Sequence, residues 1–178
     1  MTVAAQTATS QTATSQTATS QTATSRTEAD LLAVMTRIAG SSPLDVMKVR
    51  MIVEPQAAAV AAANARDADL ETIRYAHQMT EVSLEKDAFE GWDGEFHKRI
   101  FESTRNDFLT SLHDILLAIR SRPQWIELKR KTFSSTRRAQ YCGEHAAILA
   151  AIEGRDAQGA FETMRAHMIA VQRNMFAV

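Results

Sequence analysis

Residues 89–109, "FEGWDGEFHKRIFESTRNDFL", contain a pattern that indicates the fold class. Its apolar residues recur three and four positions apart, which is the spacing that lines one face of an α-helix. That face carries Phe89, Trp92, Asp93, Phe96, His97 and Ile100. Asn106 then supplies a helix cap, and a second apolar repeat begins directly after it. The stretch predicts two consecutive helices, the first with two polar side chains among aromatic ones.

The same helical period continues on both sides of this stretch. Gly40 and Gly154 end two of the expected helices, while Ser42 and Asp156 cap the helices that follow. We expect seven helices and one short segment, at about residues 27–39, 43–65, 67–84, 87–103, 107–120, 123–131 (the short segment), 135–153 and 156–175. No stretch alternates with the period of a β-strand. The predicted fold class is all-α, an antiparallel bundle of six to seven helices.

The N-terminal part of the chain has a different composition. Residues 6–25 are four copies of Gln-Thr-Ala-Thr-Ser, and a period of five matches neither a helix nor a strand. Alanine is the only apolar residue of the repeat, so we expect residues 1–26 to be a flexible low-complexity segment and residues 27–178 to form the domain. The repeat is either a linker or partner-binding tract, or a coding repeat spread by replication slippage, and its composition favours the second origin.

Composition and charge exclude several classes of protein. The 178 residues include 20 basic and 21 acidic ones, so the whole chain lacks the positive charge typical of nucleic-acid binders. The single cysteine cannot form an internal disulfide, which favours a reducing compartment. No apolar run is long enough to span a bilayer, and no signal-peptide pattern is visible at the start. We therefore expect a soluble cytoplasmic protein with no membrane partner.

Four residues form a candidate metal site. Asp93 and His97 are four positions apart and share one helix face, while His145 and His167 lie in the apolar faces of two later helices. A buried carboxylate is costly unless a cation compensates it, and one carboxylate with three imidazoles suits Zn²⁺, Ni²⁺, Fe²⁺, Mn²⁺ or Co²⁺. The alternative is that each histidine is an ordinary hydrogen-bonded core residue. The other two histidines, His77 and His113, are expected to be structural.

Two basic features also have two interpretations each. Arg50 lies on the inward face of its helix, where it either pairs with Glu54 one turn later or binds a ligand carboxylate. The region from Arg120 to Arg138 contains seven basic residues and one acidic residue. It is a solvated face or a rim, or else a contact for a phosphate backbone, and the first interpretation is favoured.

Three stretches resemble one known family. "SSPLDVMKVRMIVEPQAAAVAAANARDADL", "FEGWDGEFHKRIFESTRNDFL" and "YCGEHAAILAAIEGRDAQGAFETMRAHM" are similar to the FCD domain, the C-terminal effector-binding domain of FadR-type GntR transcription regulators. The likeness covers about residues 28–176. It implies an antiparallel helical bundle with a central metal and ligand cavity, a homodimer, and an effector that is a small organic acid.

The resemblance also assigns roles to residues. Members of the metal-binding branch hold a divalent ion, with zinc or nickel favoured here, through one Asp and three His that match Asp93, His97, His145 and His167. The family's carboxylate-binding arginine matches Arg50. Asn106 matches a turn asparagine of the family, which is a helix cap first and only weakly a ligand contact.

The N-terminal part departs from the family pattern. These regulators carry a winged helix-turn-helix before the FCD domain, but residues 1–26 hold the repeat instead, so no DNA contact is expected from this chain. The chain is expected to be a truncated regulator or a stand-alone sensor. The predicted function is a metal-dependent small-carboxylate sensor and not an enzyme. The alternatives are a small metal-dependent hydrolase and a non-functional truncated regulator.

Overall fold

The computed structural model describes residues 26–176, which contain eight helices and no strand. The predicted all-α class is confirmed. The Gln-Thr-Ala-Thr-Ser repeat lies outside the described residues. A helix covers residues 26–39 and belongs to a unit separate from the one that begins at Ser42. None of the helices in residues 26–176 combines the length and the apolar character needed to cross a bilayer.

The second unit is a bundle whose seven helices begin and end within two residues of the predicted positions. They are α2 (Pro43–Asn64), α3 (Asp67–Val82), α4 (Lys86–Ser103), α5 (Asp107–Arg120), α6 (Pro123–Thr132), α7 (Ser135–Glu153) and α8 (Ala157–Phe176). Local capping explains several of these ends. The Ser42 hydroxyl accepts the Asp45 N–H, Asn106 accepts two N–H groups at the start of α5, and Asp156 accepts the Gly159 N–H.

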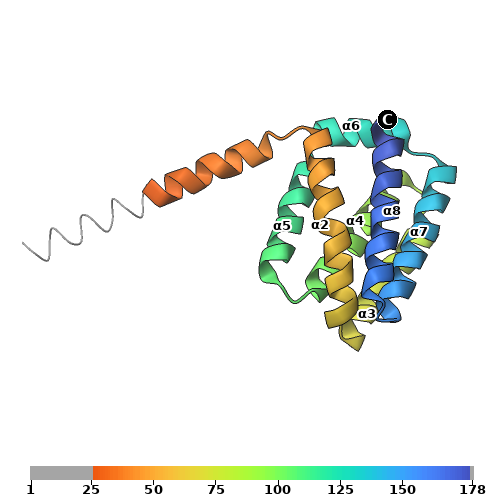
Figure 1. Ribbon diagram of the computed structural model, residues 1–178. Coiled ribbons are helices and arrows are strands. Elements are labelled where there is room, and N and C mark those ends of the chain that lie inside the picture. Colours follow the sequence, from red (N-terminus) through yellow and green to blue (C-terminus); the bar gives the residue numbers. More distant parts are fainter. Residues whose placement is uncertain (1–25, 177–178) are drawn as a thin grey trace, which may run out of the picture. The chain divides into compact units, whose positions relative to one another are not determined.

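Small side chains allow α2 to lie directly beside α8, as Figure 1 shows. The buried face of α2 includes four alanines with no exposed surface, which are Ala57, Ala58, Ala61 and Ala62. Such residues let two helix backbones approach closely, and larger side chains from α4, α7 and α8 fill the remaining interior. The short helix α6 crosses one end of this arrangement (Figure 1). The interior between α2, α4, α7 and α8 is where the predicted polar residues lie.

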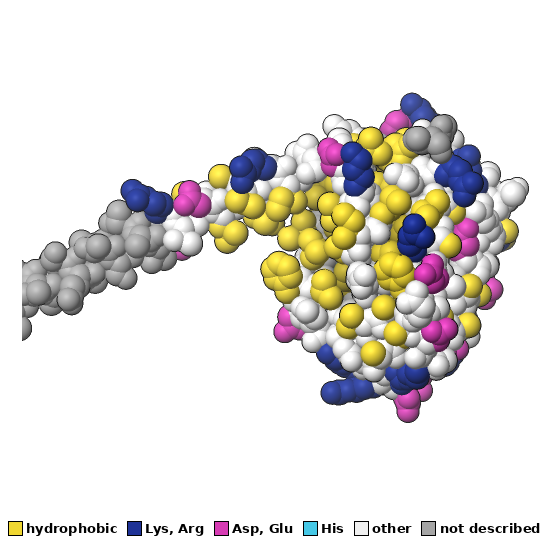
Figure 2. All heavy atoms as spheres, in the orientation of Figure 1, with side chains coloured by type: hydrophobic (Ala, Val, Ile, Leu, Met, Phe, Trp, Pro, Cys, Tyr) yellow, Lys and Arg dark blue, Asp and Glu magenta, His cyan; other side chains and the backbone are white. Residues whose placement is uncertain are grey.

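Apolar side chains also reach the surface of the bundle. Leu44, Val49 and Ile52 on α2 and Phe108 on α5 are exposed, and Phe108 retains 79% of its accessible surface. Figure 2 shows apolar side chains gathered on the face formed by these two helices. A contiguous exposed apolar surface is typical of an interaction site rather than of a solvated face.

Candidate metal centre

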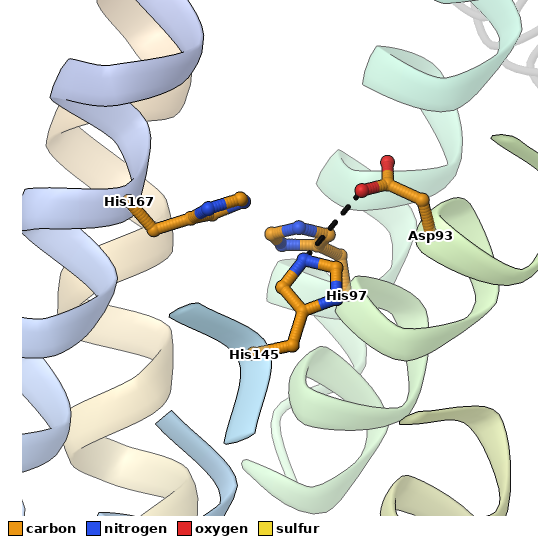
Figure 3. A group of neighbouring side chains, drawn as sticks. All are labelled: Asp93, His97, His145 and His167. Atoms are coloured by element: carbon orange, nitrogen blue, oxygen red, sulfur yellow. Dashed lines mark ion pairs between the residues drawn. The ribbon is translucent and has the colours of Figure 1, made fainter. Parts of the chain in front are cut away.

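The four predicted metal-binding residues meet in the interior of the bundle. Asp93 and His97 come from α4, His145 from α7 and His167 from α8, and Figure 3 shows the four side chains converging. One potential ligand atom from each residue lies within 4.8 Å of the others. Ligands bound to one zinc ion lie up to about 4 Å apart, so a small inward movement of the side chains brings all four into range.

The ring nitrogens of the cluster lack the partners that buried polar atoms require. All three histidines are fully buried, and the Nε2 atoms of His97, His145 and His167 have no hydrogen-bond partner. His145 Nε2 lies 3.5 Å from Asp93 Oδ1, which is beyond good hydrogen-bond distance. Buried polar atoms without partners cost free energy, and a cation between these nitrogens and the carboxylate would satisfy all of them. The donor set therefore fits a divalent ion.

Glutamates lie beside two of the three histidines, whereas His145 Nδ1 has no such partner. Glu54 Oε2 on α2 lies 2.8 Å from His97 Nδ1, and Glu144 Oε2 on α7 lies 2.6 Å from His167 Nδ1. A carboxylate at Nδ1 keeps the proton on that nitrogen and leaves the Nε2 lone pair free for a metal. Carboxylates in this position are a regular feature of histidine metal sites.

Burial and charge set the protonation of the cluster. Burial lowers the pKa of His97, although Glu54 opposes the change, and burial together with His167 lowers the pKa of His145 well below its ordinary value. Burial alone would raise the pKa of Asp93, but His97, His145 and Arg120 outweigh it and hold that pKa below its ordinary value. Neutral His97 and His145 side chains beside an ionised Asp93 are in the protonation states that bind a metal.

Arg50 forms the intrahelical pair that was one of its two predicted interpretations. Its Nε atom lies 2.5 Å from Glu54 Oε1 and its Nη2 atom 3.3 Å from Glu54 Oε2, and both side chains are buried. Arg50 and His97 both contact the Glu54 carboxylate. Burial alone would raise the pKa of Glu54, but these two neighbours together keep it well below its ordinary value. Arg50 is thereby connected to His97 through Glu54.

A small cavity of about 60 Å³ adjoins the cluster. Asp93 and His167 line it, together with Arg50, and its other walls come from α4, α6, α7, α8 and the end of α5. Asn106 is not among the lining residues, and its side chain caps α5. The cavity gives the cluster space for a small ligand on the side of Asp93.

The sequence interpretation missed three residues at this site. Glu144 follows no sequence pattern that marked it as part of the site, yet it reaches His167 on the next helix. Glu54 was considered only as a partner of Arg50. Arg120 was grouped with a solvated basic face, yet it is 5% exposed and its Nη2 atom lies 3.4 Å from Asp93 Oδ2. A useful signal was available, because each ligand histidine needs an acceptor for its second nitrogen.

The two remaining histidines lie outside the cluster, as predicted. His77 Nε2 on α3 lies 3.8 Å from Glu81 one turn later. His113 on α5 packs against Phe101, with ring centroids 4.8 Å apart. Neither belongs to the group of potential metal ligands found among the described residues.

Comparison with known proteins identifies the family. The family model of the FCD domain matches residues 45–170, which is most of the bundle. The Uxu operon transcriptional regulator of Escherichia coli (strain K12) is 31% identical over 139 residues. That alignment covers 76% of this chain but 54% of the regulator, so the chain spans about half the length of this relative.

Two solved structures share the fold. Streptococcus agalactiae GntR superposes with a TM-score of 0.60 at 18% identity, covering 78% of this chain and 60% of that one. E. coli McbR/YncC gives a TM-score of 0.65 at 17% identity, covering 75% of this chain and 63% of that one. The resemblance seen in the sequence is confirmed, and the chain belongs to the FCD-domain family of GntR-type transcription regulators.

Proposed function

We propose that this domain senses a small carboxylic acid through a bound divalent metal ion. The observation that carries the proposal is the set of three buried Nε2 atoms without hydrogen-bond partners, which converge with the Asp93 carboxylate. Without a cation these atoms are a cost to folding, and with one they are ligands. An apolar core built only for stability would not need them.

The ligand set limits the choice of ion. One carboxylate and three imidazoles suit Zn²⁺ or Ni²⁺ first, and also Fe²⁺, Mn²⁺ or Co²⁺. Four protein ligands leave two positions open on an octahedral ion. The adjoining cavity lies on the Asp93 side, where an acid could take those positions. The ion would supply a fixed positive charge for the acid, while the protein residues determine its orientation.

The same residues connect ligand binding to helix packing. The four metal ligands come from α4, α7 and α8, and Glu54 adds α2 through its contact with His97. An acid that binds more tightly to one arrangement of these helices shifts the population toward that arrangement. In a regulator with a DNA-binding head, such a shift would change how two heads are spaced. Our proposal assigns no nucleic-acid contact to the residues of this chain.

Sensing is favoured over hydrolysis, the alternative function. A metal-bound water needs a nearby general base for hydrolytic chemistry. Glu54 and Glu144 are the glutamates that reach the cluster, and each is paired with a ligand histidine. We therefore expect no turnover of chromogenic esters or lactones by the metal-loaded protein, and turnover that disappears in His145→Ala would favour the hydrolase.

We propose that a second copy of the chain covers the exposed apolar face of α2 and α5. The face carries Leu44, Val49, Ile52 and Phe108, and the family resemblance implies a homodimer. In this arrangement α2 would carry both the interface and Glu54, so that movement at the metal centre would reach the partner through one helix.

The experiment that tests the proposed function combines metal analysis with ligand screening. We expect the purified protein to contain about one divalent ion per chain, and His145→Ala to lose most of it. His77→Ala is the matched control, because it removes a histidine outside the cluster. Equal metal content in His145→Ala and the parent would contradict the metal site. Small acids should raise the melting temperature of the metal-loaded protein but not of the chelator-treated protein.

A further inference from the structure

Arg120 is a buried guanidinium with too few partners. Its side chain is almost fully enclosed at the end of α5, and its Nε atom is buried with no hydrogen-bond partner. Its contact with Asp93 Oδ2, at 3.4 Å, is long for a charge-assisted hydrogen bond. Arg50 differs in this respect, because its Nε and Nη2 atoms both contact Glu54. Of these two arginines, Arg120 is the one with capacity left for an anion.

The cavity beside Arg120 is positively charged. Its lining includes five basic side chains and two acidic ones, Glu90 and Asp93. The basic side chains are Arg50, Arg120, Lys129, Arg137 and Arg138. Lys129 pairs with Glu90 at 3.0 Å, whereas Arg137 and Arg138 donate to backbone carbonyls, which carry no net charge. The lining thus attracts an anion even before a metal ion is considered.

A bound metal ion would increase this imbalance. Asp93 is both the acidic partner of Arg120 and a member of the metal cluster. A divalent ion that uses Asp93 leaves the guanidinium without a counter-charge of its own. A buried cation without an anion is strongly unfavourable. A carboxylate placed between the ion and Arg120 would compensate both.

We propose that Arg120 binds the carboxylate of the effector. In this arrangement the remaining part of the effector carries hydroxyl or carboxylate oxygens that lie near Lys129 and Arg137. This inference rests on the proposed function and makes it more specific. The cavity of about 60 Å³ holds about four water-sized groups, so it accepts a carboxylate and a few further atoms. A larger acid of the same chemistry has to move α6 or α7 outward, and these helices carry the other basic residues.

The test uses the zinc-loaded protein and a panel of probe acids, namely acetate, lactate, malonate and galacturonate, with lactamide as a neutral analogue of lactate. Melting temperatures with and without chelator select the acid that gives the largest zinc-dependent shift. Calorimetric titration of that acid into Arg120→Gln should show a dissociation constant at least about tenfold higher than that of the parent. Metal content should stay at the parental value. Arg74→Gln, which removes a surface arginine paired with Glu153, is the control and should bind like the parent.

A second measurement uses the unmutated protein, so the inference can be tested even if Arg120→Gln fails to fold. The Arg120 Nε–H signal of the ¹⁵N-labelled protein, identified by its loss in Arg120→Lys, should shift when the selected acid saturates the site. Parental affinity in Arg120→Gln with intact metal content, or an unmoved Nε–H signal at saturation, would overturn the role of Arg120 alone. If no acid gives a zinc-dependent shift, the proposed function itself fails, and the role of Arg120 fails with it.

Discussion

Glu144 Oε2 lies 2.6 Å from His167 Nδ1, although 23 positions separate the two residues in the chain. Glu144 is adjacent to His145 in sequence, yet it orients a histidine on the next helix. One turn of α7 therefore contributes His145 to the cluster and, through the adjacent Glu144, also contacts His167 on α8. The loop between α7 and α8 has to place the two helices in one register for both contacts to form.

This contact predicts that Glu144→Gln weakens metal binding without unfolding the bundle. Glutamine still fills the space, but a neutral amide is a weaker acceptor for the Nδ1–H group and makes the imidazole a poorer ligand. Loss of such a supporting carboxylate typically reduces metal affinity about 10- to 100-fold. Competition with a zinc-binding dye measures the change. Glu162→Gln is the matched control, because Glu162 is exposed on α8 and accepts a hydrogen bond from Gln158, away from the cluster. Parental zinc affinity in Glu144→Gln would show that the carboxylate does not support the metal site.

The sequence was sufficient to predict the helices and the four polar residues that converge between them, for a physical reason. Apolar residues at helical spacing identify the buried face of each helix, and a charged or imidazole side chain within that face stands out, as Asp93, His97, His145 and His167 do. The residues that support the ligands were not found. Glu144 lies off the apolar face of α7, and only the packing of α8 beside α7 brings it to His167.

Arg120 was missed for a related reason. It ends α5 and opens a run of basic residues, and most such runs are solvated. The packing of the bundle encloses it and brings its Nη2 atom 3.4 Å from Asp93 Oδ2 on α4. Local periodicity indicates which face of a helix is buried, but it does not indicate which side chains at the ends of helices are covered by other helices.

Substitutions in the Arg50–Glu54 pair should change the stability and the zinc affinity of the protein by different amounts. Arg50→Met leaves the buried Glu54 carboxylate in contact with His97 but without its arginine, and breaking a buried pair in this way costs about 3–5 kcal/mol of unfolding free energy. Replacing both residues, as Arg50→Met with Glu54→Leu, should restore most of that stability, because no buried charge is left without its pair.

The double variant should nevertheless bind zinc about tenfold more weakly than the parent, because His97 has lost the carboxylate at Nδ1. Urea unfolding of the metal-free proteins measures stability, and dye competition measures zinc affinity. A double variant that regains both properties would mean that Glu54 serves only to neutralise Arg50.

The buried His113 side chain should make the protein less stable as the pH falls. Burial lowers the pKa of His113 to about 3, against an ordinary value of 6.5. The unfolded chain therefore takes up a proton below 6.5 while the folded protein does not until about 3, so stability falls as the pH decreases through this window. Between about pH 7 and about pH 5.5 this group contributes a loss of about 1 kcal/mol.

The variant His113→Leu isolates this contribution, because it keeps an apolar contact with Phe101 and cannot take up a proton. Urea unfolding at about pH 7 and about pH 5.5 measures the loss of unfolding free energy between them. This loss should be about 1 kcal/mol smaller for the variant than for the parent. Equal losses would show that His113 is protonated as readily in the folded protein as in the unfolded chain.

The exposed face of α2 and α5 predicts the oligomeric state. Ile52 and Phe108 retain 69% and 79% of their accessible surface, and a second copy that buries both would gain the free energy of removing them from water. We expect the parent to elute with twice its chain mass of 19.7 kDa in light scattering, and Ile52→Glu with Phe108→Glu to reduce that mass by half. Val82→Glu is the control, because Val82 is 68% exposed but ends α3. A parent that remains at 19.7 kDa at high concentration would remove the proposed interface, while the proposed metal centre, whose four residues come from one chain, would be unaffected.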